Sequence, residues 1–328
     1  MTTRHLVDPE LLAALEAMPS RAITAENLGQ VRAMRAELLA ALPPPTVTDV
    51  EVSEHHIPGP PGAPEVRVLV YVPRTTPGGR AGFLHIHGGG YIMGQPEMSD
   101  ARNRLLARDL GCVVVSVDYR LAPETAFPGA IEDCYTALRW LHAQAGDLGV
   151  DVGRIAIGGE SAGGGLAAAL ALVARDRGEV PLAFQLLIYP MLDDRTGVTV
   201  EPSPMVGEFG WSRESNRFGW ASLLGGDPGG ADVSPYAAPA RAEDLAGLPT
   251  AYIAVGTLDL FLEENIEYAR RLMRAGVPTE LHVYPGAYHG FQGVAPEARI
   301  SKAFVQDYFA VLTHALGARS GIQVDALV

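Results

Sequence analysis

A serine flanked by small residues is the first candidate for chemistry in this sequence. Gly159-Glu160-Ser161-Ala162-Gly163 fits the pattern G-x-S-x-G and lies between an apolar run and a segment rich in glycine and alanine. A sharp turn from strand into helix requires glycines two positions either side of the serine, because larger side chains would collide there. The turn leaves Ser161 at a helix N-terminus, where the dipole favours a nucleophilic oxygen and the oxyanion it produces. A phosphate-binding loop is excluded, since neither G-x-x-x-x-G-K-[ST] nor G-x-G-x-x-G occurs at this junction.

A second glycine-rich segment, HIHGGGY, closes an earlier apolar run. Consecutive glycines let the backbone approach a substrate oxygen with no side chain in the way. We predict that the N–H groups of Gly88 and Gly89, with that of Ala162, form an oxyanion hole, as such segments do in α/β-hydrolases. His87 is expected to anchor the loop by a hydrogen bond. His85 and His87 have no cysteine or carboxylate at ligand spacing, so we predict no metal there.

A serine nucleophile needs a base, and in α/β-hydrolases the acid and then the base follow the nucleophile in the chain. The histidines in question are His282, His289 and His314. His282 lies inside an expected strand and His314 inside the last expected helix. His289 lies in the loop GAYHGF, which can carry an imidazole over the edge of a sheet, and we predict that it is the base.

The acid must also follow the serine. Asp259 comes just after the apolar run AYIAVG, where the carboxyl end of a parallel strand is expected and loops converge. Asp193 and Asp194, which follow an earlier strand, and Glu263, one turn further on, are the alternatives. We favour Asp259, which predicts a triad of serine, histidine and aspartate and a covalent acyl-enzyme.

Apolar runs and helical periodicity indicate the elements that hold these residues. Strands are expected near residues 47–53, 65–72, 82–86, 112–118, 154–158, 183–189, 250–255 and 279–284. Helices are expected near residues 8–17, 25–42, 98–110, 130–145, 161–176, 262–274 and 298–316. Strands that alternate with helices favour an α/β fold with an eight-stranded, mostly parallel sheet covered on both faces, whose first two strands are antiparallel to each other.

The chain is long enough for one large domain, and one interval breaks the alternation. We therefore divide it into N-terminal helices at 1–45, a core at 46–189, an insertion at 190–249 and the rest of the core at 250–328. The insertion holds apolar residues that suit a cap over a pocket and, equally, packing of the insertion onto the core: Met205, Phe209, Trp211, Phe218 and Trp220.

The composition of the chain indicates which classes of partner it can bind. The formal net charge of −13 disfavours nucleic acid and anionic membranes, so an uncharged small molecule is the expected partner. No segment reads as a membrane span or a signal peptide, which makes the cytoplasm the expected location. Cys112 and Cys134 are expected to be buried thiols without a disulfide. The sequence leaves a homo-oligomer open.

Seven segments in order give a specific resemblance: HGGGY, DYRLAPE at 118–124, Phe127-Pro128, Asp133, GESAGGG, Ser234-Pro235 and YHGF. The sequence thereby resembles the bacterial hormone-sensitive-lipase-like esterases, which have the α/β-hydrolase fold. The resemblance implies a helical cap built from the N-terminal helices and the insertion, no cofactor, and hydrolysis of esters with short to medium acyl chains. It also implies that Arg120 and Glu124 brace loops around the site.

Two residues depart from the family pattern, and two other functions remain to be weighed. Glu160 stands where the family usually has aspartate, and Leu260 stands where proline commonly follows the acid.

Plant gibberellin receptors resemble the same family but lack the base, so His289 argues against a binding protein without catalysis. Amide or peptide hydrolysis uses the same triad, but esters have the better leaving group.

Overall fold

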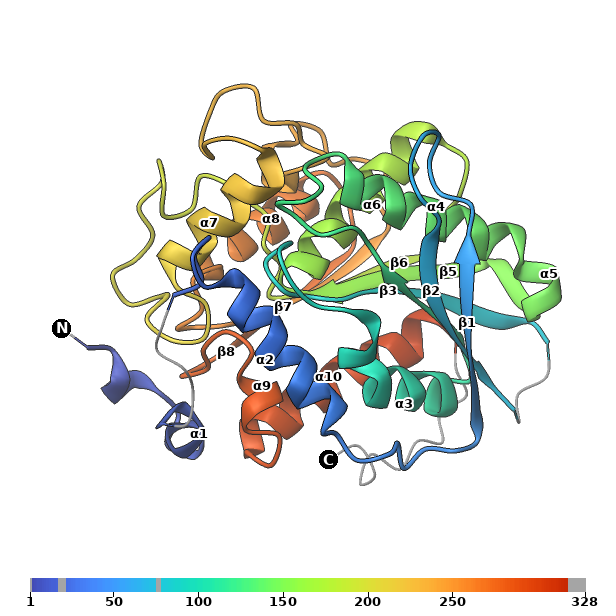
Figure 1. Cartoon of the computed structure of the whole chain (residues 1–328), viewed down its shortest axis with the longest axis horizontal. Helices are drawn as coiled ribbons and strands as arrows, with labels where there is room; N and C mark the ends of the chain where they lie inside the picture. Colours follow the sequence, from blue (N-terminus) through green and yellow to red (C-terminus); the bar gives the residue numbers. More distant parts are fainter. Residues whose placement is uncertain (1, 17–21, 75–77, 318–328) are drawn as a thin grey trace.

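The central sheet has eight strands, in the order β1-β2-β4-β3-β5-β6-β7-β8 (Figure 1). The computed structural model describes residues 2–16, 22–74 and 78–317. The strands are β1 Val50–Ile57, β2 Val66–Pro73, β3 Arg80–Ile86, β4 Val113–Asp118, β5 Val150–Glu160, β6 Phe184–Ile188, β7 Thr250–Gly256 and β8 Thr279–Tyr284. All eight expected strands are present.

Strand directions follow the prediction. β3 pairs in parallel with β4 and β5, and the parallel pairing continues through β6, β7 and β8. β2 is antiparallel to both of its neighbours, β1 and β4. The central strands are buried on both faces, which explains why their sequences are continuous apolar runs rather than alternating ones. The predicted α/β-hydrolase sheet is therefore confirmed.

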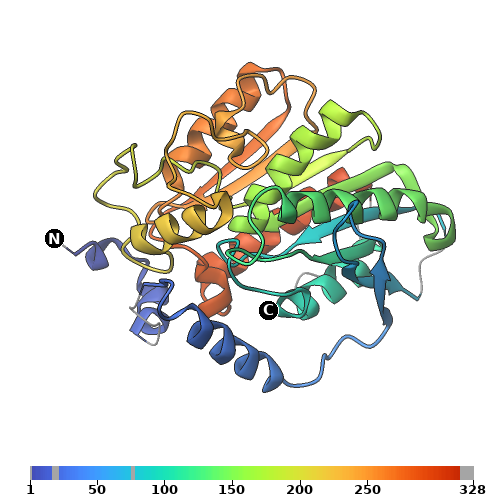
Figure 2. The same ribbon diagram turned by 45° about the horizontal axis from the view of Figure 1, so that its top comes forward.

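Helices cover both faces of the sheet (Figure 2). One core packs against α4 Gly129–Ala143, α6 Ala162–Arg177 and α8 Leu262–Arg274, and a second packs against α3 Asp100–Leu110 and α10 Arg299–Ala315. The remaining helices are η1 Arg4–Leu6, η2 Pro9–Leu11, α1 Leu12–Glu16, α2 Leu28–Ala40, η3 Pro96–Ser99, α5 Ala145–Leu148, α7 Arg213–Leu224, η4 Pro239–Arg241 and α9 Phe291–Val294. None of the described helices combines the length and apolar character needed to cross a bilayer.

Element boundaries differ from the prediction where the hydrophobic signal is weak. β1 extends to Ile57 through exposed polar residues, because an edge strand needs an apolar face only where it meets the core. β5 begins at Val150 rather than near 154, and Val150 pairs with Arg80 beyond a register shift. The first expected helix is a 3-10 turn followed by α1, and its last residue, 17, lies outside the described residues.

The insertion at 190–249 contains α7, a helix that the sequence did not predict. Trp220 of α7 is fully buried, with its ring 5.2 Å from that of Tyr91. Trp211, just before α7, lies against Gly90, where a β-carbon would come within 2.3 Å of the indole. These indoles therefore tie the insertion to the loop after β3. The division into core and cap stays a prediction.

Both cysteines are buried thiols without a disulfide, as predicted. Burial raises the pKa of the Cys112 thiol to about 12, so this thiol stays protonated at neutral pH. It therefore behaves as a small apolar side chain of the core.

Candidate active site

Ser161 lies at the turn between β5 and α6. Its backbone has φ 56° and ψ −122°, a conformation that residues other than glycine rarely adopt. Two backbone hydrogen bonds hold this conformation: Ser161 N donates to Ile188 O at 2.9 Å, and Met191 N donates to Ser161 O at 3.0 Å. The strained turn is thus fixed by the end of β6 and the loop that follows.

The flanking glycines are needed because the end of β3 packs directly on this turn. A β-carbon on Gly159 would lie 2.2 Å from Ile86 O, and one on Gly163 would lie 2.1 Å from the same oxygen. Real β-carbons do not approach an oxygen so closely, so both positions require glycine. The packing places the loop after β3 beside Ser161.

A chain of hydrogen bonds connects Ser161 to His289 and Asp259. His289 Nε2 lies 2.9 Å from Ser161 Oγ, and His289 Nδ1 lies 2.8 Å from Asp259 Oδ2. Because a carboxylate accepts, Nδ1 carries a proton, which leaves Nε2 of the neutral ring free to accept from the serine hydroxyl. The loops after β5, β7 and β8 supply the three residues, all at the carboxyl edge of the sheet.

Aromatic rings enclose the imidazole. The Phe261 ring meets His289 at 5.2 Å and 87°, and the Tyr189 ring meets it at 4.6 Å and 64°. Trp211 of the insertion lies 6.5 Å away. The His289 side chain is therefore only 11% exposed, and its orientation is set by packing as well as by Asp259.

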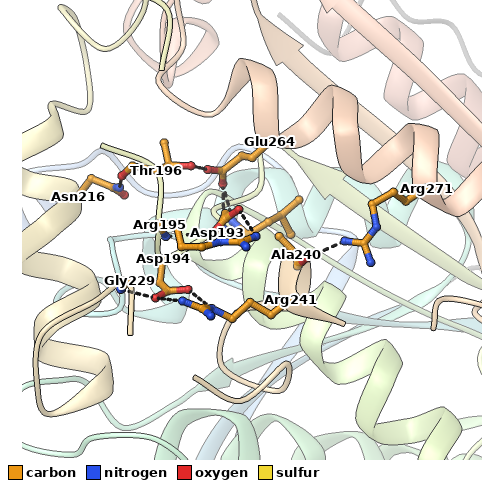
Figure 3. Close-up of polar contacts among 11 residues, drawn as sticks. Asp193, Asp194, Arg195, Thr196, Asn216, Gly229, Ala240, Arg241, Glu264 and Arg271 are labelled. Atoms are coloured by element: carbon orange, nitrogen blue, oxygen red, sulfur yellow. Dashed lines mark hydrogen bonds and ion pairs between the residues drawn. The ribbon is translucent and has the colours of Figure 1, made fainter. Parts of the chain in front are cut away.

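The alternative acids have other partners, and Figure 3 shows Asp193 and Asp194 beside their arginines. Asp193 pairs with Arg195 at 2.8 Å, and Asp194 pairs with Arg241 at 2.5 Å. Glu263 is exposed and accepts from a backbone N–H at 2.9 Å. Among the described residues, Asp259 instead has no arginine or lysine partner and accepts from the Phe261 N–H and His289.

The alternative histidines are also placed away from the serine. His282 is on β8, 2.7 Å from Glu280 and 3.4 Å from Asp307. His314 is exposed near the end of α10. Of the three histidines, the structure brings only His289 to Ser161.

The predicted oxyanion loop lies against the turn. A β-carbon on Gly88 would be 2.8 Å from Glu160 O and 3.5 Å from Ser161 Cβ, so this backbone is adjacent to the serine. Within the described part of the chain, the N–H groups of Gly88, Gly89 and Ala162 donate to no protein acceptor. They are therefore available to a ligand oxygen. Gly89 O closes the loop by accepting from the N–H groups of residues 92 and 93, both at 3.1 Å.

His87 contacts its own loop, as the sequence suggested. Its Nδ1 lies 2.9 Å from Gly88 O, and its ring stacks on Tyr119 at 4.2 Å. The Tyr119 hydroxyl donates to His87 O at 2.9 Å. Burial lowers the pKa of His87 to about 4, so the ring is neutral at physiological pH and acts as a hydrogen-bonding anchor.

The residue before the serine forms a partly buried ion pair that the sequence analysis did not predict. Glu160 pairs with Arg102 of α3, and its other oxygen lies 3.4 Å from Nε2 of His85. Burial opposes ionisation of Glu160, but the Arg102 charge and these hydrogen bonds lower its pKa to about 2. The glutamate found where the family usually has aspartate thus ties the serine turn to α3.

A buried carboxylate on α8 holds the loop after β6 (Figure 3). Glu264 accepts from Leu192 N at 2.7 Å, from Asp193 N at 3.3 Å and from the Thr196 hydroxyl. Burial raises the pKa of Glu264 well above its ordinary value. Sequence reasoning missed this residue, because its partners lie about seventy positions away along the chain.

The DYRLAPE segment contacts helices on both sides. Arg120 binds Asp133 of α4 at 2.7 Å, and Glu124 binds Arg32 of α2 at 2.6 Å. Both contacts agree with the bracing role that the resemblance implies, although the partner of Glu124 comes from the N-terminal helices.

A cavity of about 390 Å³ opens beside Glu160, and this volume suits a small organic molecule. Its walls are mainly apolar side chains of β3, β6, α3 and α10, among them Phe83, Leu186, Ile188, Phe304 and Tyr308. Among the described residues, no group of three or more histidine, cysteine or acidic side chains could hold a metal ion.

The sheet order, with the serine, histidine and aspartate meeting at its carboxyl edge, defines the class of α/β-hydrolases. A family model described as the alpha/beta hydrolase fold matches residues 83–293. The chain belongs to this family and, within it, to the esterases that are similar to hormone-sensitive lipase.

Relatives and solved structures agree with this membership. Esterase LipI of Mycobacterium tuberculosis is 38% identical over 296 residues, which cover 88% of this chain and 89% of LipI. Carboxylesterase NlhH of the same species is 34% identical, over 88% of this chain and 90% of NlhH. The structure titled "Bacterial Heroin Esterase" superposes with a TM-score of 0.89 at 43% identity, over 97% of this chain and all of that one.

Glu160→Gln should lower the free energy of unfolding by about 3 kcal/mol at neutral pH, because it leaves the partly buried guanidinium of Arg102 without its anion. The folded-state pKa of Glu160, about 2, lies below its ordinary value of 4.5. The ion pair therefore contributes fully above pH 4.5 and is lost as the pH falls towards 2. Denaturant unfolding of both proteins at several pH values measures this difference, which should shrink by more than half by about pH 3. A constant difference over that range would contradict the assignment.

Proposed function

We propose that this protein hydrolyses carboxylic esters with short to medium acyl chains, with Ser161 as nucleophile, His289 as general base and Asp259 as the acid that orients it. The observation that carries the proposal is the continuous chain of hydrogen bonds between these three side chains, at 2.9 Å and 2.8 Å. The relatives named as esterases support the same reaction.

The proposed reaction has two halves. His289 Nε2 takes the hydroxyl proton while Ser161 Oγ attacks the ester carbonyl carbon. The N–H groups of Gly88, Gly89 and Ala162 bind the oxyanion, and Asp259 stabilises the imidazolium. Collapse of the tetrahedral intermediate breaks the bond to the alkoxy oxygen, and His289 gives its proton to the leaving alcohol.

Water then releases the acyl group. His289 takes a proton from the water as it attacks the acyl carbon, and the second tetrahedral intermediate expels Ser161 Oγ, which recovers its proton from the imidazolium. The substrate we propose is an uncharged small-molecule ester. We also propose that residues 1–45 and 190–249 form a cap over the core segments 46–189 and 250–328, since Trp211 of the insertion lies near His289.

Amide hydrolysis is a second candidate, supported by one relative. Arylacetamide deacetylase of Bos taurus is 32% identical over 69% of this chain and 72% of its own length. An amide has the poorer leaving group and needs more proton donation from His289, so we expect amides to be slower substrates than esters. An imidazole held between a serine and a buried aspartate favours catalysis over a function in binding alone.

Ser161→Ala should abolish ester turnover and leave the fold intact, because it removes a single hydroxyl from a small side chain. We expect kcat to fall by about a million-fold, the scale seen when a triad loses its nucleophile. A panel of p-nitrophenyl esters measures the rate, and circular dichroism checks the fold. Turnover within a few-fold of the unaltered protein would reject the assignment.

The assignment of Asp259 as the acid is tested by comparing the effect of its substitution with that of Glu263, a nearby carboxylate at the start of α8. Asp259→Asn should lower kcat by about ten-thousand-fold, since an asparagine can hold the wrong imidazole tautomer. Glu263→Gln serves as the matched control and should leave kcat within about twofold, as expected for an exposed surface change. Asp194→Asn tests the other alternative. If it proves more damaging than Asp259→Asn in folded protein, the acid is misassigned.

Acyl length should matter because a pocket closed by the proposed cap segments, residues 1–45 and 190–249, would be finite. Each buried methylene adds about 0.8 kcal/mol of binding until the chain meets the wall. Values of kcat/KM for p-nitrophenyl esters should rise from acetyl to butanoyl or hexanoyl and fall by dodecanoyl. An optimum at hexadecanoyl would instead indicate an open acyl groove.

A further inference from the structure

One arginine of the N-terminal helix α2 connects two loops of the candidate site. Arg32 Nε donates to Ile92 O at 2.7 Å, and Nη2 donates to Ala122 O at 2.9 Å. The same guanidinium binds both oxygens of Glu124, at 2.6 Å and 2.9 Å. A single planar group thus holds the loop after β3 and the DYRLAPE segment together.

The contact with Ile92 leads directly to the oxyanion loop. Ile92 N donates to Gly89 O at 3.1 Å, while Ile92 O accepts from Arg32. Gly89 is one of the proposed oxyanion donors. Two hydrogen bonds through Ile92 therefore separate the guanidinium of Arg32 from Gly89, the residue whose own N–H would bind the oxyanion.

Two further hydrogen bonds of this loop come from the segment after β4. Tyr119 holds His87 O at 2.9 Å, and Ala122 N donates to Tyr91 O at 3.0 Å. Ala122 is itself bound by Arg32 through its carbonyl oxygen. Arg32 therefore connects α2 both to the loop after β3 and to the segment that supports this loop.

The ion pair alone does not account for this arrangement. The Glu124 side chain is 62% exposed, and exposed ion pairs add little to stability. The carboxylate instead orients the guanidinium fork, so that its remaining N–H groups meet two carbonyl oxygens. The value of such a contact lies in geometry, because oxyanion donors must be held close to their productive positions.

We propose that Arg32 is a positioning residue that fixes the oxyanion loop and couples the N-terminal helix α2 to transition-state stabilisation. The inference rests on the proposed ester hydrolysis. It assigns α2 a part in the rate of the reaction, beyond any part in covering the substrate.

The experiment uses the full chain with Arg32→Met, Arg32→Lys and Glu124→Gln. Arg270→Met is the matched control, since it removes a similar two-bond pair with Glu267 on the exposed side of α8. Each protein is assayed for kcat/KM on a p-nitrophenyl ester. Inhibition constants are measured for a trifluoromethyl ketone, which adds to the serine and places an oxyanion in the hole, and for the matching methyl ketone, which represents the ground state.

We expect Arg32→Met to lower kcat/KM by about tenfold to a hundredfold. The inhibition constant of the trifluoromethyl ketone should rise by the same factor. The inhibition constant of the methyl ketone should stay within about threefold of its value for the unaltered protein, because its binding does not depend on the oxyanion donors. Glu124→Gln keeps both carbonyl contacts of Arg32 and should have an effect below about fivefold, and Arg270→Met should change neither inhibitor by more than about twofold.

Equal weakening of both ketones, or an unchanged trifluoromethyl ketone affinity in folded Arg32→Met, would overturn the inference. If Arg32→Met does not fold, Arg32→Lys decides: it keeps the charge but cannot reach both loops, and it must weaken the trifluoromethyl ketone selectively by at least about threefold. An unaltered protein that turns over no ester would reject the proposed function itself, whereas an active protein with an indifferent Arg32 rejects only this inference.

Discussion

The close approach of two backbones is the constraint on which the candidate site depends. Ile86 O at the end of β3 lies within the space that a β-carbon on Gly159 or Gly163 would need. This contact forces glycine at both positions and sets the residues after Ile86 beside Ser161. The serine and the free N–H groups are therefore brought together by strand packing rather than by side chains, which gives the arrangement little freedom to relax.

The carboxylates around this contact are distinguished by their partners. Glu160 and Asp194 are neutralised by arginines, and Glu264 accepts backbone N–H groups. Asp259 is fully buried and faces His289 with no cation beside it in the described part of the chain. Its charge is thus available to stabilise an imidazolium, and this difference separates the proposed acid from its neighbours better than loop position does.

The sequence predicted those parts of the molecule whose structure depends on residues that are close together in the chain. The glycines around Ser161, the loop of His289 and the continuous apolar strands carry their reasons within a few residues, and the sheet followed from them. Arg102 and Arg32 were missed, because their partners lie more than fifty residues away and an arginine on a helix ordinarily faces solvent. The helix α7 was missed for a related reason, since its packing depends on Tyr91 of another loop.

The two segments that we propose as the cap both contact the loop of the proposed oxyanion donors. The insertion packs Trp211 on Gly90, and α2 binds Ile92 through Arg32. Gly210, beside the tryptophan, also approaches the backbone of His289, where a β-carbon would lie 2.3 Å from its carbonyl oxygen. A cap anchored in this way, if these segments form one as we propose, would not shift without moving the groups proposed to do the chemistry. Changes in its substrate-facing side chains can therefore alter the choice of ester alone, whereas changes at these anchors alter the rate as well.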